Sequence, residues 1–397
     1  MRLLYITNGF PFPLTSGYLR HYFLLRELRE RHDVTLLSLV GSGFEQEHAA
    51  AVEPFTVQLR TFGGAPRSGA QKVARRLRAL RVGHAEGAVA AMRDAASSMV
   101  GAGAVDAAVF SGKGTFPVLG ALGDLPVVVD LCDATSSRLR GALRFQDRRR
   151  VPSTLLEYVQ VRRVEHRLLE RGDQLLFASA RDRDALLGGA APNAVVVPNG
   201  VDVDHWTRRA ATLGRDEVVF TGKMSYPPNE HAALHLATDV MPIVRRAVPS
   251  AHLSIVGTEP TARLRRLGGG PGVTVTGFVE DVRPYLERAA VFAAPLRFGA
   301  GIQNKVLEAM AMAVPVVASS VAASGLTLED GTAAPVTVAD DPVGVAGAVV
   351  AKLLAARDDP EPDSAARRHV EDHFVWRRSA QLVEGALRLA VGQGPSD

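Results

Sequence analysis

Cysteine is nearly absent from this sequence, which has only Cys132 among its 397 residues. A single cysteine excludes an intrachain disulfide and a zinc site built from cysteines alone. Long hydrophobic runs are also missing, since none approaches the roughly 18 residues that cross a bilayer. The first residues, MRLLYIT, lack the apolar stretch and small-residue cleavage site of a signal peptide. These absences favour a cytoplasmic protein.

Charge of one sign is not in large excess, because 46 Lys and Arg face 42 Asp and Glu and leave a net charge of +4. Bases do cluster in 67–81 and in 144–150. Each cluster fits either a solvated helix face or a contact with an anionic membrane surface or an acidic acceptor. The aromatic pattern that stacks nucleic-acid bases is missing, so we expect no nucleic-acid partner.

Short apolar segments alternate with longer segments of helical periodicity. The expected strands are 2–7, 34–40, 106–110, 126–131, 174–179, 194–198, 217–221, 252–256, 273–276, 291–295, 315–319 and 335–338. The expected helices include 18–30, 151–171, 229–246, 281–288, 302–313 and 342–356. Continuous Val, Ile and Leu runs indicate parallel strands covered on both faces. One open sheet rarely exceeds about ten strands, so we expect an α/β chain with two doubly wound parallel sheets that divides near 200–214.

The segment 291–320 carries the strongest site signal. Its strand ends in a loop of small residues, Gly299-Ala300-Gly301, which leads into a helix. Backbone N–H groups at such a helix start bind anions, and the helix dipole favours the negative charge. Lys305 and Glu308 lie on one face of this helix. Either Lys305 meets a diphosphate while Glu308 accepts hydrogen bonds from ribose, or the two form an ion pair that offsets its own burial.

Two other strand ends carry weaker versions of this turn. Gly222 and Lys223 follow a strand and precede a helix for which Asn229 is the expected cap. Lys223 either contacts the same phosphates or is simply solvated. A third turn offers backbone groups to a planar base at Phe278 and Val279, although a glycine after a strand is common.

The first half of the chain has a comparable loop at Ser16-Gly17, which opens the helix expected at 18–30. This loop either touches the donor phosphate or the acceptor, or is a plain connection between a strand and a helix.

The motifs FTGKMSYPPN (220–229), TGFVEDV (276–282) and GAGIQNKVLEAM (299–310) resemble, in this order, the second domain of retaining GT-B glycosyltransferases of family 4. The residues of these motifs are most similar to those of bacterial sugar transferases of exopolysaccharide and PEP-CTERM systems. The resemblance implies two Rossmann-like domains that face each other across a cleft. An acceptor-binding domain would span 1–200 and a sugar-nucleotide-binding domain 201–375. Residues 376–397 would form a helix that returns to the first domain and then a frayed tail.

The resemblance also implies roles for individual residues. Glu308 matches the second glutamate of the family's Glu-x7-Glu motif, which holds the ribose. The first glutamate would fall at Ala300 and is absent, so backbone amides of Ala300, Gly301 and Ile302 would contact the sugar. Phe278 and Val279 would lie by the base, and Lys305 with Lys223 would neutralise the diphosphate. The family's first-domain histidine is also missing, and Asp133 is either its substitute or the cap of a helix or turn.

The function implied is transfer of a sugar from a nucleotide-diphosphate sugar to a hydroxyl acceptor, with retention of anomeric configuration and without a metal or other cofactor. A UDP-sugar is the expected donor, and a small molecule, a glycan or a lipid-linked sugar the expected acceptor. A nucleotide-sugar epimerase on the same scaffold and a non-catalytic sugar-nucleotide-binding subunit are the alternatives. An epimerase would need carboxylates and a histidine that converge on the sugar, and the motifs do not place them.

Overall fold

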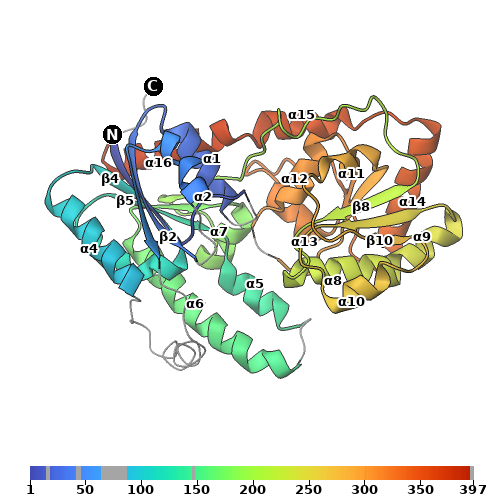
Figure 1. Cartoon of the computed structure of the whole chain (residues 1–397), viewed down its shortest axis with the longest axis horizontal. Coiled ribbons are helices and arrows are strands. Elements are labelled where there is room, and N and C mark those ends of the chain that lie inside the picture. Colours follow the sequence, from blue (N-terminus) through green and yellow to red (C-terminus); the bar gives the residue numbers. More distant parts are fainter. Residues whose placement is uncertain (15–17, 42–45, 64–86, 145–147, 300, 394–397) are drawn as a thin grey trace. The chain divides into compact units, whose positions relative to one another are not determined.

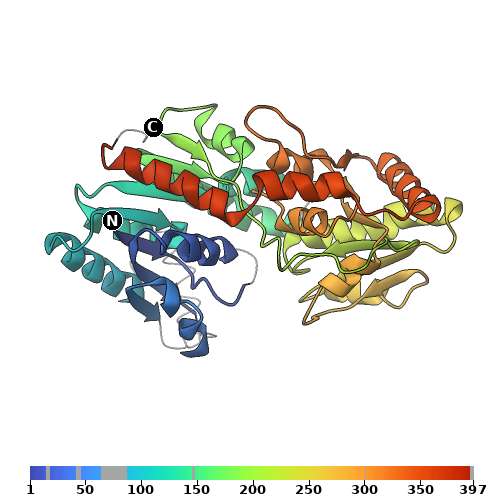
Figure 2. The same ribbon diagram turned by 90° about the horizontal axis from the view of Figure 1, so that it is seen from above.

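The structure is a computed structural model that describes the chain except for residues 15–17, 42–45, 64–86, 145–147, 300 and 394–397. The chain divides into two compact units. Unit 1 comprises 1–178, 182–197 and 376–397, and unit 2 comprises 179–181 and 198–375. The chain therefore returns to unit 1 for its last helix, which is drawn in red (Figures 1 and 2).

Unit 1 is built on a sheet whose seven described strands are all parallel. They are β1 (Arg2–Thr7), β2 (Asp33–Val40), β3 (Gln58–Gly63), β4 (Ala107–Ser111), β5 (Val127–Cys132), β6 (Gln174–Phe177) and β7 (Ala194–Val196). Their spatial order, β3-β2-β1-β4-β5-β6-β7, reverses between β1 and β4. Sheets of this kind bind ligands at the reversal, outside the carboxyl ends of the strands.

Helices cover both faces of this sheet (Figure 1). They are α1 (Leu19–Leu28), α2 (Gln46–Ala50), α4 (Gly87–Gly101), α5 (Thr135–Ala142), α6 (Val151–Arg171), α7 (Ala180–Leu187) and α16 (Trp376–Ala390), with 3₁₀ segments η1 (Glu53–Phe55), η2 (Lys113–Leu122) and η3 (Arg148–Arg150). Alternate residues of a strand point to opposite faces. Leu3 of β1 accordingly packs in the core with α1 and α16, and Leu4 in the core with α4, η2 and α6.

The edge strand β3 is absent from the strands expected from the sequence. Its residues, QLRTFG, are half-buried or exposed and form no apolar run. An edge strand needs fewer apolar residues because solvent reaches it, so hydrophobic patterning alone does not reveal it.

Unit 2 repeats the same plan with six described strands, all parallel. They are β8 (Glu217–Thr221), β9 (His252–Val256), β10 (Val273–Val275), β11 (Val291–Ala294), β12 (Val316–Ala318) and β13 (Thr337–Val338). Their order, β10-β9-β8-β11-β12-β13, reverses between β8 and β11. The prediction of two doubly wound parallel sheets is confirmed, and the twelve expected strands all form.

The helices of unit 2 lie on both faces of its sheet (Figures 1 and 2). They are α8 (Pro227–His235), a π-helical turn (Leu236–Val240), α9 (Met241–Ala247), α10 (Ala262–Leu267), α11 (Arg283–Arg288), α12 (Asn304–Ala311), α13 (Ser320–Ala323), the 3₁₀ turn η5 (Ser324–Leu326), α14 (Pro342–Asp358) and α15 (Ser364–His373).

The start of α8 corrects one expectation. Asn229 does not cap this helix, because α8 begins at Pro227 and its cap position is Tyr226. Proline suits the first helical position, where its missing N–H would have no helical acceptor. Asn229 therefore lies inside the first turn, and its side chain is available for other contacts.

No helix among the described residues is long and apolar enough to span a membrane.

Candidate functional site

The carboxyl edge of the unit 2 sheet carries most of the residues that the sequence singled out. The strand order reverses between β8 and β11, which are direct neighbours. The loop that contains Gly222 and Lys223 leaves β8, and the loop that contains Gly299 and Gly301 leaves β11 and leads into α12. Two segments separated by about 80 residues of sequence thus meet where open parallel sheets bind ligands.

A hydrogen-bonded chain joins these two loops. The ammonium group of Lys305 donates to Oδ1 of Asn229 at 2.6 Å, and Nδ2 of Asn229 donates to the carbonyl oxygen of Lys223 at 3.0 Å. Asn229 is buried, and the Lys305 ammonium lies 5.6 Å from the centroid of the Phe220 ring. An amide oxygen satisfies one N–H of the ammonium without neutralising it. The positive charge of Lys305 therefore stays available to an anion.

Gly222 makes this arrangement sterically possible. Its φ is +149°, and a Cβ there would lie 2.7 Å from Nδ2 of Asn229 and 3.3 Å from Cε of Lys305. A side chain at this position would displace the amide and crowd the lysine. The absence of a side chain at Gly222 therefore leaves the space that Lys305 and Asn229 occupy.

The environment of α12 shifts both of its charged side chains toward neutrality. Burial lowers the pKa of Lys305 to about 8, an effect partly opposed by the charge of Glu308. Burial raises the pKa of Glu308 to about 7, and the charge of Lys305 partly opposes that shift. Groups with such shifted pKa values are concentrated at functional sites. A bound anion would favour the charged form of Lys305, and a hydroxyl donor would favour the charged form of Glu308.

Both ends of α12 are fixed. At the start, Nδ2 of Asn199 donates to Oδ1 of Asn304 at 2.9 Å, and the cap residue Gln303 makes no side-chain cap hydrogen bond. At the end, Arg367 donates to the Ala311 carbonyl at 2.7 Å, and a second arginine donates to the next carbonyl. Cations at a helix C-terminus complement its dipole. The N-terminus of the helix thus lies at the carboxyl edge without a cap hydrogen bond from the side chain of Gln303.

The second lysine of the site is held differently. Nζ of Lys223 lies 2.8 Å from Oε1 of Glu259, and both side chains are about half exposed. Ser225 donates to the other oxygen of Glu259 at 2.6 Å. Glu259 has a φ of +54°, which is unusual for a non-glycine residue. Neither Glu259 nor the bridging role of Asn229 was predicted from the sequence. The one available signal was the position of Asn229 six residues after Lys223, which lies in the turn between β8 and α8.

Phe278 and Val279, which were expected to contact the nucleobase of the donor, follow β10, the edge strand of the same sheet. The side chain of Phe278 is 73% exposed, the largest value among the described exposed hydrophobic residues. Val279 is half-buried. Gly277 before them has a φ of +72°, which turns the chain at the end of the strand. An exposed aromatic ring at this edge is suited to stacking on a planar ligand.

In unit 1, Asp133 follows β5 at the carboxyl edge. Its carboxylate lies 3.5 Å from Nζ of Lys113 and accepts a hydrogen bond from the Thr135 hydroxyl at 2.6 Å. Lys113 also lies 3.5 Å from the buried carboxylate of Glu165. The cap position of α5 is Ala134, so Asp133 does not cap that helix. It belongs to a cluster in which the lysine is balanced by carboxylates.

A second cluster in unit 1 is fully buried. Nε of Arg20 donates to Asp130 at 2.8 Å. His21 pairs through Nδ1 with the Tyr5 hydroxyl at 3.0 Å and through Nε2 with the Ser111 hydroxyl at 3.2 Å. Burial lowers the pKa of His21 to about 4. Both ring nitrogens are thus engaged within the protein, which is the arrangement of a core histidine.

Three predicted site residues lie outside the described part of the chain. They are Ser16, Gly17 and Ala300. Gly301 and Ile302 are described, and Gly301 has a φ of +68°. A Cβ on Gly325 would lie 3.0 Å from the Gly301 carbonyl oxygen, so the loop packs closely on the turn after α13.

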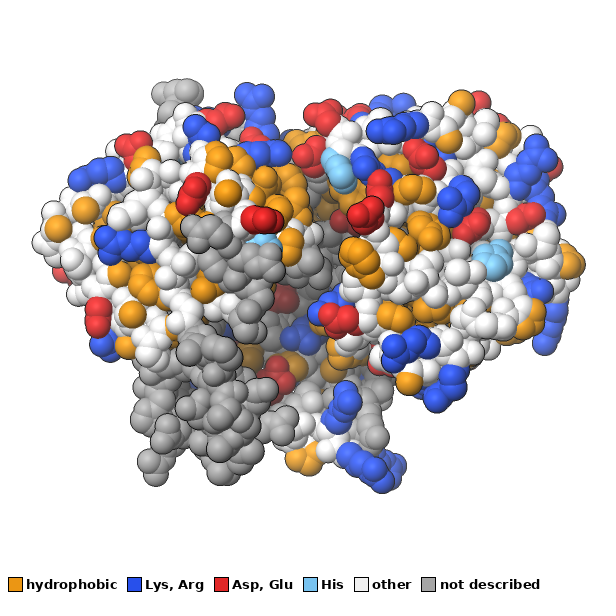
Figure 3. Space-filling view, viewed as in Figure 1, with side chains coloured by type: hydrophobic (Ala, Val, Ile, Leu, Met, Phe, Trp, Pro, Cys, Tyr) orange, Lys and Arg blue, Asp and Glu red, His pale blue; other side chains and the backbone are white. Residues whose placement is uncertain are grey.

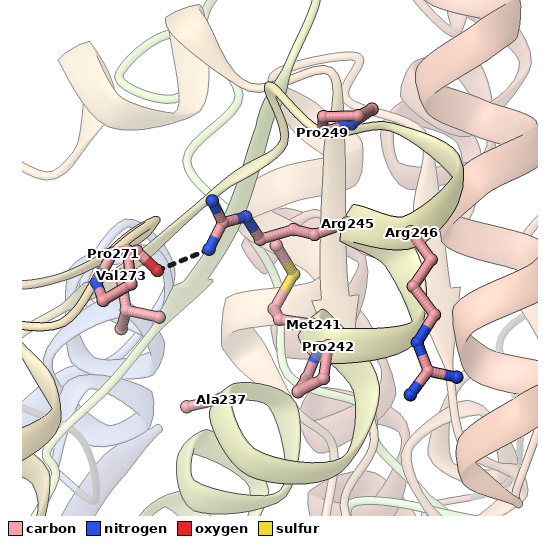
Figure 4. Close-up of a pocket in the computed structure, with 8 residues that line it drawn as sticks. All are labelled: Ala237, Met241, Pro242, Arg245, Arg246, Pro249, Pro271 and Val273. Atoms are coloured by element: carbon pink, nitrogen blue, oxygen red, sulfur yellow. Dashed lines mark hydrogen bonds between the residues drawn. The ribbon is translucent and has the colours of Figure 1, made fainter.

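A separate hollow of about 490 Å³ lies beside α9 (Figure 4). It is lined by Ala237, Met241, Pro242, Arg245, Arg246, Pro249, Pro271 and Val273. Arg245 donates to the Pro271 carbonyl at 2.7 Å. Val273 is the first residue of β10, so the hollow is at the amino ends of the strands. It is therefore separate from the carboxyl edge that carries the lysines.

Residues 215–355 match the family model described as Glycosyl transferases group 1. The matched range contains Lys223, Asn229, Lys305 and Glu308. This part of unit 2 is therefore similar to the group 1 glycosyltransferases.

Two curated relatives extend this similarity. The phosphatidyl-myo-inositol mannosyltransferase of Mycobacterium tuberculosis (strain ATCC 25618 / H37Rv) is 31% identical over 213 residues, which cover 51% of this chain and 56% of that protein. The protein of the same name from Mycobacterium leprae is 31% identical over 169 residues, which cover 41% of this chain and 44% of that protein. The chain thus spans about half the length of the curated relatives it matches.

Solved structures resemble the chain over almost its whole length. The Anabaena protein HepE in complex with UDP and glucose has a TM-score of 0.67 at 16% identity, over 98% of this chain and 100% of that one. The sucrose-phosphate synthase of Thermosynechococcus elongatus has a TM-score of 0.69 at 15% identity, over 99% and 100%. These likenesses show the GT-B fold. The family resemblance drawn from the sequence is confirmed, and the exopolysaccharide type stays a prediction.

Proposed function

We propose that the chain transfers a sugar from a nucleotide-diphosphate sugar to a hydroxyl acceptor, with retention of anomeric configuration and without a metal. The observation that carries this proposal is the Lys305 ammonium at the reversal of the unit 2 sheet. It is held there by the neutral amide of Asn229, in the first turn of α12. A diphosphate matches this combination of a fixed cation and helix N–H groups.

The other donor contacts follow from the same edge. Glu308 would accept hydrogen bonds from the ribose hydroxyls, and Phe278 with Val279 would contact the base. Lys223 would leave Glu259 and turn toward the phosphates, since both partners of that ion pair are about half exposed and solvent screens their attraction. The solved HepE complexes contain UDP and UDP-glucose, which supports a UDP-sugar as the donor.

The chemistry asked of these residues is stabilisation of a leaving group. As the bond between C1 and the diphosphate oxygen breaks, negative charge grows on the diphosphate and the sugar becomes oxocarbenium-like. Lys305, Lys223 and the N–H groups of the α12 start would hold that charge. The acceptor oxygen forms the new bond to C1 on the face that the diphosphate leaves, and its proton passes to a diphosphate oxygen. Asp133 is the proposed unit 1 residue near the sugar.

A turnover assay tests the proposal. The full chain is mixed with UDP-, GDP- and dTDP-sugars, each with and without a panel of hydroxyl acceptors, and free nucleoside diphosphate is measured. We expect nucleotide release that depends on the acceptor, survives EDTA and yields a product with the anomeric configuration of the donor. A sugar altered without acceptor would instead identify an epimerase. Nucleotide binding without any turnover would identify a binding subunit.

A further inference from the structure

A helical hairpin in unit 1 ends in a strongly basic segment. Helices α5 and α6 pack against each other, and residues 143–150 connect them. From Arg138 to Arg163 the sequence contains eight arginines and two acids. Arg144 and the three arginines of η3 are exposed. Positive charge is thus concentrated where the hairpin turns, and basic side chains gather at the foot of Figure 3, where this hairpin ends in Figure 1.

The same part of α6 exposes an apolar face. Leu155, Leu156 and Val159 are 45%, 43% and 42% exposed. Their spacing of one, three and four residues puts them on one side of the helix. They begin five residues after η3, so the apolar face follows the arginines directly. We call Arg144, η3, Leu155, Leu156 and Val159 the hairpin tip.

An anionic bilayer matches both properties of the hairpin tip. Each arginine near an anionic membrane surface strengthens binding to it roughly fivefold, and large apolar side chains beside the arginines enter the boundary between headgroups and acyl chains. Nucleic acid would use the arginines but would leave the leucines exposed. A second copy of the chain in a two-fold contact would bring the same arginines together, which costs electrostatic energy.

We propose that the hairpin tip docks the protein on an anionic lipid surface, with the arginines at the headgroups and the apolar face of α6 at the acyl boundary. This surface lies in unit 1, and the proposal does not depend on the donor site of unit 2. A membrane-bound or lipid-linked acceptor would then be approached by a protein already at the surface.

Vesicle sedimentation with the full chain tests the proposal without any sugar donor. We expect binding to vesicles of phosphatidylglycerol in phosphatidylcholine and none to phosphatidylcholine alone. Raising the salt from about 0.1 M to 1 M should release the protein, because the screening length falls from about 10 Å to 3 Å. Changing the three arginines of η3 to glutamine should lower the partition coefficient about a hundredfold, at roughly fivefold per arginine.

Matched controls carry the same chemical changes elsewhere. Arg263, Arg265 and Arg266 of α10 are exposed, so their triple change to glutamine removes the same charge from unit 2. Val343 and Leu354 of α14 are exposed apolar residues, and their change to serine controls for Leu155→Ser with Leu156→Ser. Equal losses in the control and tip variants would overturn the proposal. So would binding to neutral vesicles, or a tip-dependent dimer in light scattering without vesicle binding.

Discussion

The described strands of the two sheets follow the same order, apart from one additional edge strand in unit 1, but the charged residues at their carboxyl edges are paired differently. In unit 1, Arg20 is paired with Asp130, and Lys113 lies between Asp133 and Glu165. In unit 2, Lys305 is bonded to an amide instead of a carboxylate. Among the described residues, Lys305 of unit 2 therefore retains its charge for an incoming anion, whereas Arg20 and Lys113 of unit 1 already face carboxylates. The difference teaches that two sheets of the same plan can differ in whether a cation at the carboxyl edge is balanced within the protein.

The largest effect is expected from Lys305→Ala. Removing a cation that acts on the developing charge should lower kcat by about a hundred- to a thousandfold, with a smaller change in nucleotide affinity. Steady-state kinetics with the donor identified in the turnover assay measure both. The paired variant is Lys113→Ala, whose lysine is balanced by carboxylates. An equal loss of kcat in Lys113→Ala would break the comparison between the two edges.

The next effect concerns the ribose contact. Glu308→Ala should weaken nucleotide binding about ten- to a hundredfold, because a hydrogen bond to a charged group contributes about 1.5–3 kcal/mol. Isothermal titration with nucleoside diphosphates measures the change. Asp133→Ala is the matched loss of a carboxylate from the unit 1 edge and should leave nucleotide affinity unchanged. Unaltered binding in Glu308→Ala would return this residue to a purely structural role.

The amide of Asn229 offers a sharper test of why the unit 2 cation is available. Asn229→Asp keeps the shape but places a carboxylate 2.6 Å from Nζ of Lys305, as judged from the present amide oxygen. The lysine would then resemble Lys113, and diphosphate affinity should fall about tenfold, the equivalent of roughly 1.4 kcal/mol. The pKa of Lys305 should rise. Tighter diphosphate binding in this variant would contradict the argument.

The smallest effect is the pH dependence of donor binding. The pKa of Lys305 is lowered to about 8, so its ammonium loses the proton as the pH rises through that value and diphosphate affinity should fall. The side chain in Lys305→Arg stays charged, so the diphosphate affinity of this variant should not change with pH near 8.

Glu308 has the opposite shift: its pKa is raised from 4.5 to about 7, so the folded state binds this proton more tightly than the unfolded state does. The free energy of unfolding should therefore decline from pH 4.5 to 7, and Glu308→Gln should remove that slope.

Hydrophobic patterning was sufficient for the parallel sheets because their strands are covered on both faces. Strands such as β8 and β11 consist of continuous apolar residues, and both were predicted within a residue of their ends. The edge strand β3 lacks that pattern, and no local signal replaced it. A strand has a continuous apolar run only when both of its faces are buried, so hydrophobic patterning does not reveal strands that are exposed to solvent.

The candidate site was predicted less completely, for a different reason. The glycine turns and the lysines are local features of the sequence, and the structure brings Gly222 and Lys305 to one edge. The contact between Asn229 and Lys305 spans 76 residues and depends on which strands become neighbours. Asparagine is a residue type that often caps helices, so the sequence favoured Asn229 as the cap. The structure shows that α8 begins two residues earlier, at Pro227. The carboxylate of Glu259 beside Lys223 was equally invisible to a local motif.

The return of the chain to unit 1 has a consequence for its biosynthesis. Helix α16 supplies Ala380, Val383 and Leu387 to the core beneath β1, and Trp376 stacks on Phe23 of α1 with ring centroids 5.0 Å apart. During translation, residues 198–375 are synthesised before this helix. Domains usually fold in the order in which they are translated. In this chain the core of unit 1, whose synthesis begins first, is completed only after unit 2 has been synthesised.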